Sequence, residues 1–148
     1  MMNSELELFK QNDYAKNLLK YPMLKLADDI NKKYKIKSIN PCYYWLMSND
    51  NKMALSGYHV EFDNELTLSV QFGNGHYASN RNKRFNMTFN VSNQFSFLEI
   101  SDTAEIAILR NNVLVYIDEW EDKVLGYQTP DEIIQVIDKY IIGNLLEP

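Results

Sequence analysis

The side chains that most often carry out chemistry are scarce in this chain: two histidines, His59 and His76, and one cysteine, Cys42. A Cys–His pair is a nucleophilic arrangement, and the two histidines with the Glu61 carboxylate could bind a transition metal or supply a general base. The spacings typical of such sites, His-Glu-x-x-His or Cys-x-x-Cys, are absent from the sequence. Cys42 also stands beside the apolar run Tyr43–Met47, which favours a buried, inert thiol. We therefore expect structural or surface roles here, with no catalytic residue, metal or cofactor.

A polar loop combines two glycines with a cluster of basic residues. Glycine allows backbone N–H groups to surround an anion, and the basic side chains add positive charge beside a histidine and a tyrosine that offer stacking surface. This pattern predicts a phosphate, nucleotide or nucleic-acid binding module, although neither the P-loop nor the dinucleotide-binding motif is present. The alternative is a solvated hairpin loop. The candidate anion-binding residues are Gly73, Gly75, His76, Tyr77, Arg81, Lys83 and Arg84.

Four carboxylates surround one tryptophan further along the chain, in the run Asp118, Glu119, Trp120, Glu121 and Asp122. Such a cluster could imitate nucleic-acid phosphates, or it could dock on a basic partner with Trp120 as an aromatic anchor. The calcium-loop pattern Asp-x-Asp/Asn-x-Asp/Asn-Gly is absent. The alternative is a solvated turn between a strand and a helix.

Charge is distributed unevenly over the 148 residues, whose formal net charge is −5. Residues 1–37 carry eight lysines against five acids, whereas residues 99–148 carry three basic against eleven acidic residues, a formal charge of −8. This balance predicts weak repulsion of nucleic acid. The N-terminus lacks a signal-peptide pattern and no uncharged apolar stretch reaches the roughly 20 residues that span a bilayer, so we expect a cytoplasmic protein.

Local signals predict a single α+β domain over residues 1–148, with a helical segment over 1–35, an antiparallel β-sheet meander over 36–127 and a C-terminal helix over 129–146 packed on the sheet. A capping box of Ser4 and Glu7 indicates one helix start, and Pro22 suits the first turn of a second helix. Thr129-Pro130-Asp131-Glu132 marks the start of the last helix, and Gly143 is a candidate end.

Period-two alternation of apolar residues predicts the strands. The clearest are 58–62 and 66–72, joined at Asp63-Asn64-Glu65 as an antiparallel hairpin. Further strands are expected within 85–91, 95–100, 105–109 and 113–117, with turns at 49–51 and 110–112. The run Tyr43–Met47 could equally form core or a homo-oligomer interface.

Three blocks of sequence resemble small uncharacterised proteins of phages and prophages: LSVQFGNGHY at 68–77, AEIAIL at 104–109 and VLGYQTPDEI at 124–133. The resemblance covers about residues 66–137. It implies a phage accessory protein acting in a bacterial cytoplasm. Small acidic phage proteins of this kind are often inhibitors of host machinery, including anti-CRISPR and other anti-defence proteins.

The sequence therefore predicts a non-enzymatic, phage-type binding protein that inhibits or modulates a host protein. A nucleic-acid-handling defence enzyme, such as a CRISPR effector nuclease, is the expected target because its basic grooves attract acidic surfaces. The acidic run 118–122 is the expected interface. The alternative is the anion-binding module built on the basic loop.

Overall fold

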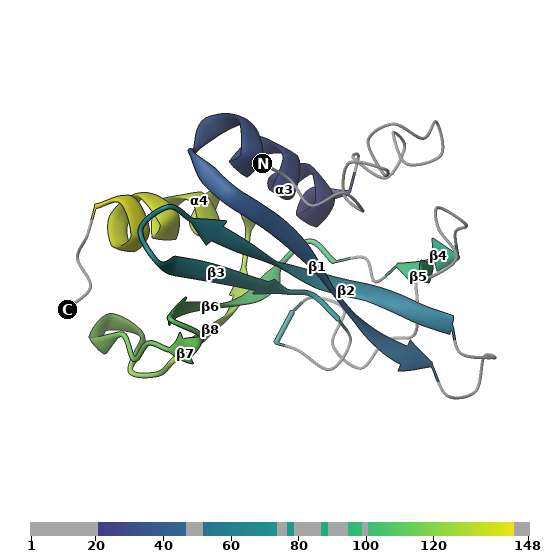
Figure 1. The fold of residues 1–148 in the computed structure, drawn as a ribbon. Helices are drawn as coiled ribbons and strands as arrows, with labels where there is room; N and C mark the ends of the chain where they lie inside the picture. Colours follow the sequence, from purple (N-terminus) through teal and green to yellow (C-terminus); the bar gives the residue numbers. More distant parts are fainter. Residues whose placement is uncertain are drawn as a thin grey trace.

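A mixed sheet with two helices on one of its faces forms the molecule (Figure 1). The structure is a computed structural model that describes residues 21–46, 52–73, 77–78, 87–88, 95–98 and 101–143. In chain order the elements are α3 (Pro22–Lys33), β1 (Ile36–Leu46), β2 (Lys52–Phe62), β3 (Leu66–Gln71), β4 (Met87–Thr88), β5 (Phe95–Leu98), β6 (Ala104–Arg110), β7 (Val113–Leu114), the 3₁₀ turn η1 (Asp118–Trp120), β8 (Val124–Gln128), α4 (Pro130–Val136) and the π-helical turn η2 (Ile137–Ile142).

The predicted α+β class, with a helix before and a helix after an antiparallel sheet, is confirmed. β1 pairs along one edge of β2, and β2, β3 and β6 follow one another as antiparallel neighbours. The far edge of β6 is shared by β7 and β8, both antiparallel to it. One pairing departs from a simple meander: β5 runs parallel to β2, beside Met53–Leu55.

The core lies between the sheet and the helices. The predicted alternation of apolar and polar residues decides which side chains of the strands enter it. Tyr58, Val60 and Phe62 of β2 are buried, as are Leu66, Leu68 and Val70 of β3 and Phe72, which follows that strand. Tyr58 is fully buried, and its hydroxyl donates to the Met23 carbonyl of α3 at 2.7 Å. α3 contributes Met23, Leu26, Ala27 and Ile30, and the C-terminal helix contributes Ile133, Ile137, Tyr140 and Ile141.

Both described helices begin where the sequence predicts. Pro22 occupies the first turn of α3, and Thr129 with Glu132 forms a reciprocal capping box at the start of α4. Regular α-helix ends at Val136 and continues as η2, whose Gly143 N–H donates to the Asp138 carbonyl at 2.9 Å. The helical structure thus stops at the predicted Gly143, and the expected residues beyond it lie outside the described part of the chain.

The strands differ from the predictions at two places. The expected strand 113–117 is short: β7 covers Val113–Leu114, and Ile117 forms an isolated bridge with Asp122 because the chain turns out of the sheet into η1. β8 was not predicted as a strand. Its alternation is broken by Gly126 and by Tyr127, whose φ is 56°.

Other sequence predictions fall wholly or partly outside the described residues. The helix expected after Ser4 and the turn 49–51 lie there entirely. Of the strand expected over 85–91, the structure describes only β4. In the described ranges, no helix has the length and apolar character needed to cross a membrane.

Candidate functional site

The acidic run forms a closed turn, which we call the acidic turn (residues 118–122). Backbone hydrogen bonds close it: the Trp120 N–H donates to the Ile117 carbonyl at 3.0 Å, the Glu121 N–H donates to Asp118 at 3.1 Å, and the Ile117 N–H donates to Asp122 at 3.0 Å. Glu121 adopts a left-handed conformation with φ of 54°. Ile117 is buried beneath the turn, whereas the side chains of Asp118, Glu121 and Asp122 are exposed. The backbone therefore holds three carboxylates outward in a defined arrangement.

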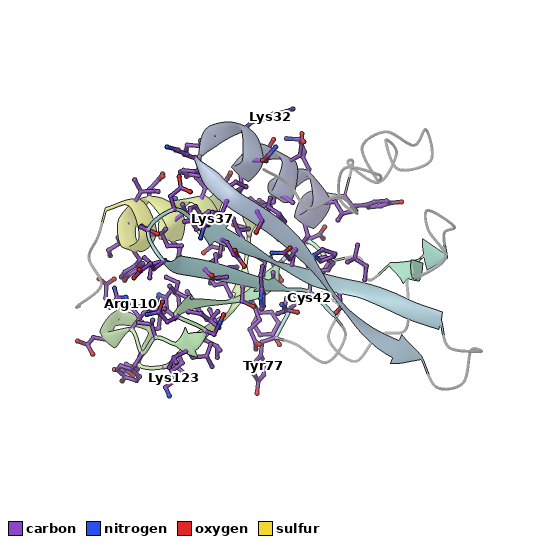
Figure 2. The ribbon with its side chains drawn as sticks, in the orientation of Figure 1. Lys32, Lys37, Cys42, Tyr77, Arg110 and Lys123 are labelled. Carbon is purple, nitrogen blue, oxygen red and sulfur yellow. The ribbon has the colours of Figure 1, made fainter. Side chains whose placement is uncertain are left out.

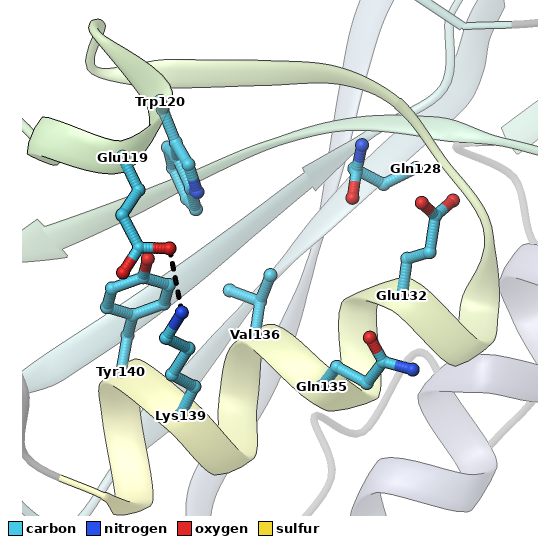
Figure 3. Close-up of a pocket in the computed structure, with 8 residues that line it drawn as sticks. All are labelled: Glu119, Trp120, Gln128, Glu132, Gln135, Val136, Lys139 and Tyr140. Atoms are coloured by element: carbon cyan, nitrogen blue, oxygen red, sulfur yellow. Dashed lines mark hydrogen bonds and ion pairs between the residues drawn. The ribbon is translucent and has the colours of Figure 1, made fainter.

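The other two residues of the acidic turn face the protein's own C-terminal helix (Figure 3). Glu119 Oε2 accepts from Lys139 Nζ at 2.7 Å, and the Trp120 ring packs edge-to-face on Tyr140 with ring centroids 5.8 Å apart. Trp120 is half-buried against the core. These contacts attach the turn to η2. Because Trp120 is partly covered by Tyr140, a partner could contact only the exposed part of its indole ring.

The hydrogen bond between Lys139 and Glu119 favours the charged form of both groups. The Lys139 ammonium lowers the pKa of the Glu119 carboxyl, and Glu119 raises the pKa of Lys139. Burial raises the pKa of Tyr140. Glu119 and Lys139 are therefore both charged at neutral pH and compensate each other, which leaves the net negative charge of the turn on Asp118, Glu121 and Asp122.

A shallow groove of about 190 Å³ lies beside these contacts, between the acidic turn and the C-terminal helix. Figure 3 shows the turn on one side and the helix on the other, with polar side chains from both along the groove. Carboxylates and amides dominate the lining, which suits polar or cationic groups of a partner. The lining residues are Glu119, Trp120, Gln128, Glu132, Gln135, Val136, Lys139 and Tyr140.

Of the candidate anion-binding residues in the basic loop (residues 73–84), the structure describes Gly73 and Tyr77. Gly73 is buried, and Tyr77 is held on β8: the Tyr127 N–H donates to the Tyr77 carbonyl at 2.8 Å, and the two rings lie 6.3 Å apart. The Tyr77 N–H also donates to Glu105 Oε2 at 3.4 Å. The remaining candidates, Gly75, His76, Arg81, Lys83 and Arg84, lie outside the described residues, so the anion site stays a prediction.

His59 lies on the sheet face opposite the helices. It alternates with the buried Tyr58 and Val60, and its register partners are Asn40 on β1 and Ser69 on β3. Burial lowers the pKa of His59, so its imidazole is neutral at pH 7. His76, its expected metal partner, lies outside the described residues. Within the described ranges no three His, Cys, Asp or Glu side chains gather as metal ligands do.

Cys42 lies on β1, two residues beyond Asn40, the register partner of His59. It is half-buried, which corrects the expectation of a buried thiol. It stands at a register shift in β1, opposite Gly57. Gln71 Nε2 contacts Cys42 Sγ at 3.4 Å, and burial raises the pKa of the thiol. With a protonated thiol and a neutral imidazole, these two residues do not form the ion pair that activates a cysteine nucleophile.

Sequence reasoning missed Lys139 and Tyr140, the residues that receive the acidic turn. They follow Glu119 and Trp120 by twenty positions, and no local pattern connects such distant residues.

Comparisons of this chain with protein-family models, curated proteins and solved structures find no match. The resemblance to phage proteins therefore stays a prediction.

Proposed function

We propose that this chain is a non-enzymatic binding protein that engages a basic surface of another protein through the acidic turn. One observation carries the proposal: the turn is closed by backbone hydrogen bonds and attached to the C-terminal helix by Glu119 and Trp120, while Asp118, Glu121 and Asp122 stay exposed. Because the backbone of the turn is already closed, binding costs it little backbone conformational entropy.

The partner proposed is a nucleic-acid-handling defence enzyme of a bacterial host, which this chain would inhibit as an anti-CRISPR-like phage protein. The formal charge of −8 over residues 99–148 supports a basic partner, because opposite fields accelerate association and disfavour wrong partners. The phage resemblance of residues 66–137 supports the choice of a host defence protein. The basic groove of such an enzyme, which normally binds nucleic acid, would bind the carboxylates of the acidic turn in place of phosphates.

A charge-reversal pair tests the proposal. In Asp118→Lys with Glu121→Lys, both altered side chains are exposed. The matched control is Glu65→Lys with Asp102→Lys, because Glu65 is also an exposed glutamate with left-handed φ, here 70°, and Asp102 is an exposed loop aspartate. The two variants have the same net charge and differ in where it is changed.

The measurement is capture of a partner from a bacterial host lysate by the tagged full chain, followed by assay of the captured protein's nuclease activity. We expect the wild type and the control to retain one stoichiometric protein and to inhibit it, and the acidic-turn variant to bind it at least about tenfold more weakly. Equal retention by the acidic-turn variant would contradict the proposal. Retention of nucleic acid or nucleotide alone would favour the basic loop instead.

A further inference from the structure

Three exposed apolar side chains lie on the hairpin that precedes the acidic turn. Val113 is 66% exposed, Leu114 41% and Tyr116 54%. The hairpin turn itself is well formed, since Asn111 and Asn112 both have positive φ, as a type I′ turn requires. Because Val113 and Tyr116 leave more than half of their surface in water, apolar area remains that a partner could bury. Exposed apolar side chains gathered within residues 113–116 are typical of an interaction surface.

The hairpin and the acidic turn follow one another along the same edge of the sheet. Leu114 is opposite Leu109, the Val115 N–H donates to the Ile108 carbonyl at 2.8 Å, and the buried Ile117 then leads into the turn. Figure 1 shows β7 and the helical turn η1 beside each other at the end of the sheet away from β1. In the described part of the chain β7 pairs with β6 alone, so its outer edge faces away from the sheet.

We propose that residues 113–122 form one docking surface, and that its occupant is a basic segment of a partner protein in which lysine or arginine alternates with apolar side chains. The apolar side chains of the segment pack on Val113, Leu114 and Tyr116, and its cations lie against Asp118, Glu121 and Asp122. This inference rests on the proposed function and names the chemistry of the partner that the acidic turn would engage.

Charge selects this occupant over a second copy of the chain. Pairing two copies at this edge would bring two acidic turns together, and like charges in an interface are unfavourable. Arg110 and Lys123 are the basic residues nearest in sequence to the surface, and they are outnumbered by the carboxylates of the turn (Figure 2). An apolar centre beside a charged rim is also the usual anatomy of a protein interface.

Three synthetic peptides of equal length test the inference by fluorescence anisotropy with the full chain: alternating Arg and Leu, alternating Arg and Ser, and alternating Glu and Leu. The apolar variant is Val113→Ser with Tyr116→Ser. Its matched control is Tyr77→Ser with Ile142→Ser, a tyrosine and a β-branched residue that are 48% and 54% exposed elsewhere on the surface. Because all four side chains are exposed, thermal unfolding should show that both variants stay folded.

We expect the Arg–Leu peptide to bind most tightly, and the apolar variant to weaken that binding at least about fivefold while the control leaves it unchanged. Amide NMR shifts in the wild type should concentrate at residues 113–122. If the acidic-turn variant loses binding but the apolar variant does not, this inference fails and the proposed function stands. If neither variant changes binding, both fail. Dimerisation of the chain that the apolar variant abolishes would overturn the inference by naming a second copy as the occupant.

Discussion

Glu119 differs from the other carboxylates of the acidic turn because it forms an ion pair with a lysine of the C-terminal helix, whereas Asp122 Oδ1 accepts from the neighbouring Lys123 N–H. The contact of Glu119 with Lys139 at 2.7 Å joins two segments twenty residues apart, so it serves the fold while Asp118, Glu121 and Asp122 face outward. The sequence predicted the cluster as a unit, and the structure divides it. Residue types and their spacing reveal a concentration of charge, but only tertiary packing decides which of the charges is compensated.

The lowered pKa of Glu119 makes stability depend on pH. Because the hydrogen bond from Lys139 lowers this pKa below the ordinary value of 4.5, the contribution of Glu119 is fully present above pH 4.5 and is lost as the pH falls through the lowered folded-state value. We expect the free energy of unfolding to decrease on acidification in that window, and Glu119→Gln to show a smaller decrease. Chemical denaturation at a series of pH values measures this. Glu65→Gln, at an exposed glutamate outside this contact, is the control, and a slope for Glu119→Gln identical to that of the wild type would contradict the assignment.

Gly126 is required by a close approach between β8 and the segment that contains Tyr77. A Cβ at position 126 would lie 2.7 Å from Tyr77 Cβ, closer than carbon atoms approach in folded proteins. We expect Gly126→Ala to destabilise the protein by about 1–3 kcal/mol, measured by denaturant unfolding. In a Tyr77→Gly background, which removes the obstructing Cβ, most of this cost should disappear. A cost that persists in that background would place the clash elsewhere.

At the scale of elements, regular patterns were predicted and irregular ones were not. Strict alternation in β2 and β3 and the capping box of α4 are local properties, so the sequence reveals them directly. β8 contains a glycine and a left-handed tyrosine, and it is a strand because β6 offers it an edge. The parallel pairing of β5 with β2 cannot be predicted from local sequence either, because it joins segments that are distant along the chain. The groove of the candidate site is bounded by η1 and α4, which only the tertiary fold brings together.

The start of α4 positions one wall of that groove. The Thr129 side chain accepts from the Glu132 N–H at 3.3 Å, and Glu132 Oε1 accepts from the Thr129 N–H at 3.0 Å. We expect Thr129→Ala to lower the free energy of unfolding by about 1 kcal/mol, because the N-terminal N–H groups of the helix lose a partner. Thr129→Ser keeps the hydroxyl and should stay close to wild type in the same thermal or denaturant measurement. Equal destabilisation by both substitutions would mean that the methyl group, and not the cap, is responsible.

At the scale of the whole molecule, charge and apolar exposure meet at one edge of the sheet. The acidic third of the chain contains β7, η1 and the C-terminal helix. Two lysines of α3 are paired locally, Lys25 with Asp29 and Lys32 with Asp28, whereas Lys33 lies 3.7 Å from the Asp138 carboxylate of η2. The basic N-terminal segment and the acidic C-terminal third were both evident from composition. That the acidic third also presents Val113, Leu114 and Tyr116 to solvent required the structure, because alternation alone predicted a strand and not its exposed position at the edge.

The acidic turn and the exposed apolar side chains of the proposed surface should have different kinetic roles in binding. Long-range attraction by the acidic turn should set the association rate of a basic segment, whereas contacts with the apolar side chains form only after docking and should set the dissociation rate. We expect the association rate constant of the Arg–Leu peptide to fall steeply as salt rises, since the screening length shortens to about 8 Å at about 0.15 M. Asp118→Lys with Glu121→Lys should flatten this salt dependence. Val113→Ser with Tyr116→Ser should accelerate dissociation and leave the salt dependence of association unchanged. Stopped-flow mixing over a range of salt concentrations measures both rates, and an association rate insensitive to salt in the wild type would contradict electrostatic steering by the acidic turn.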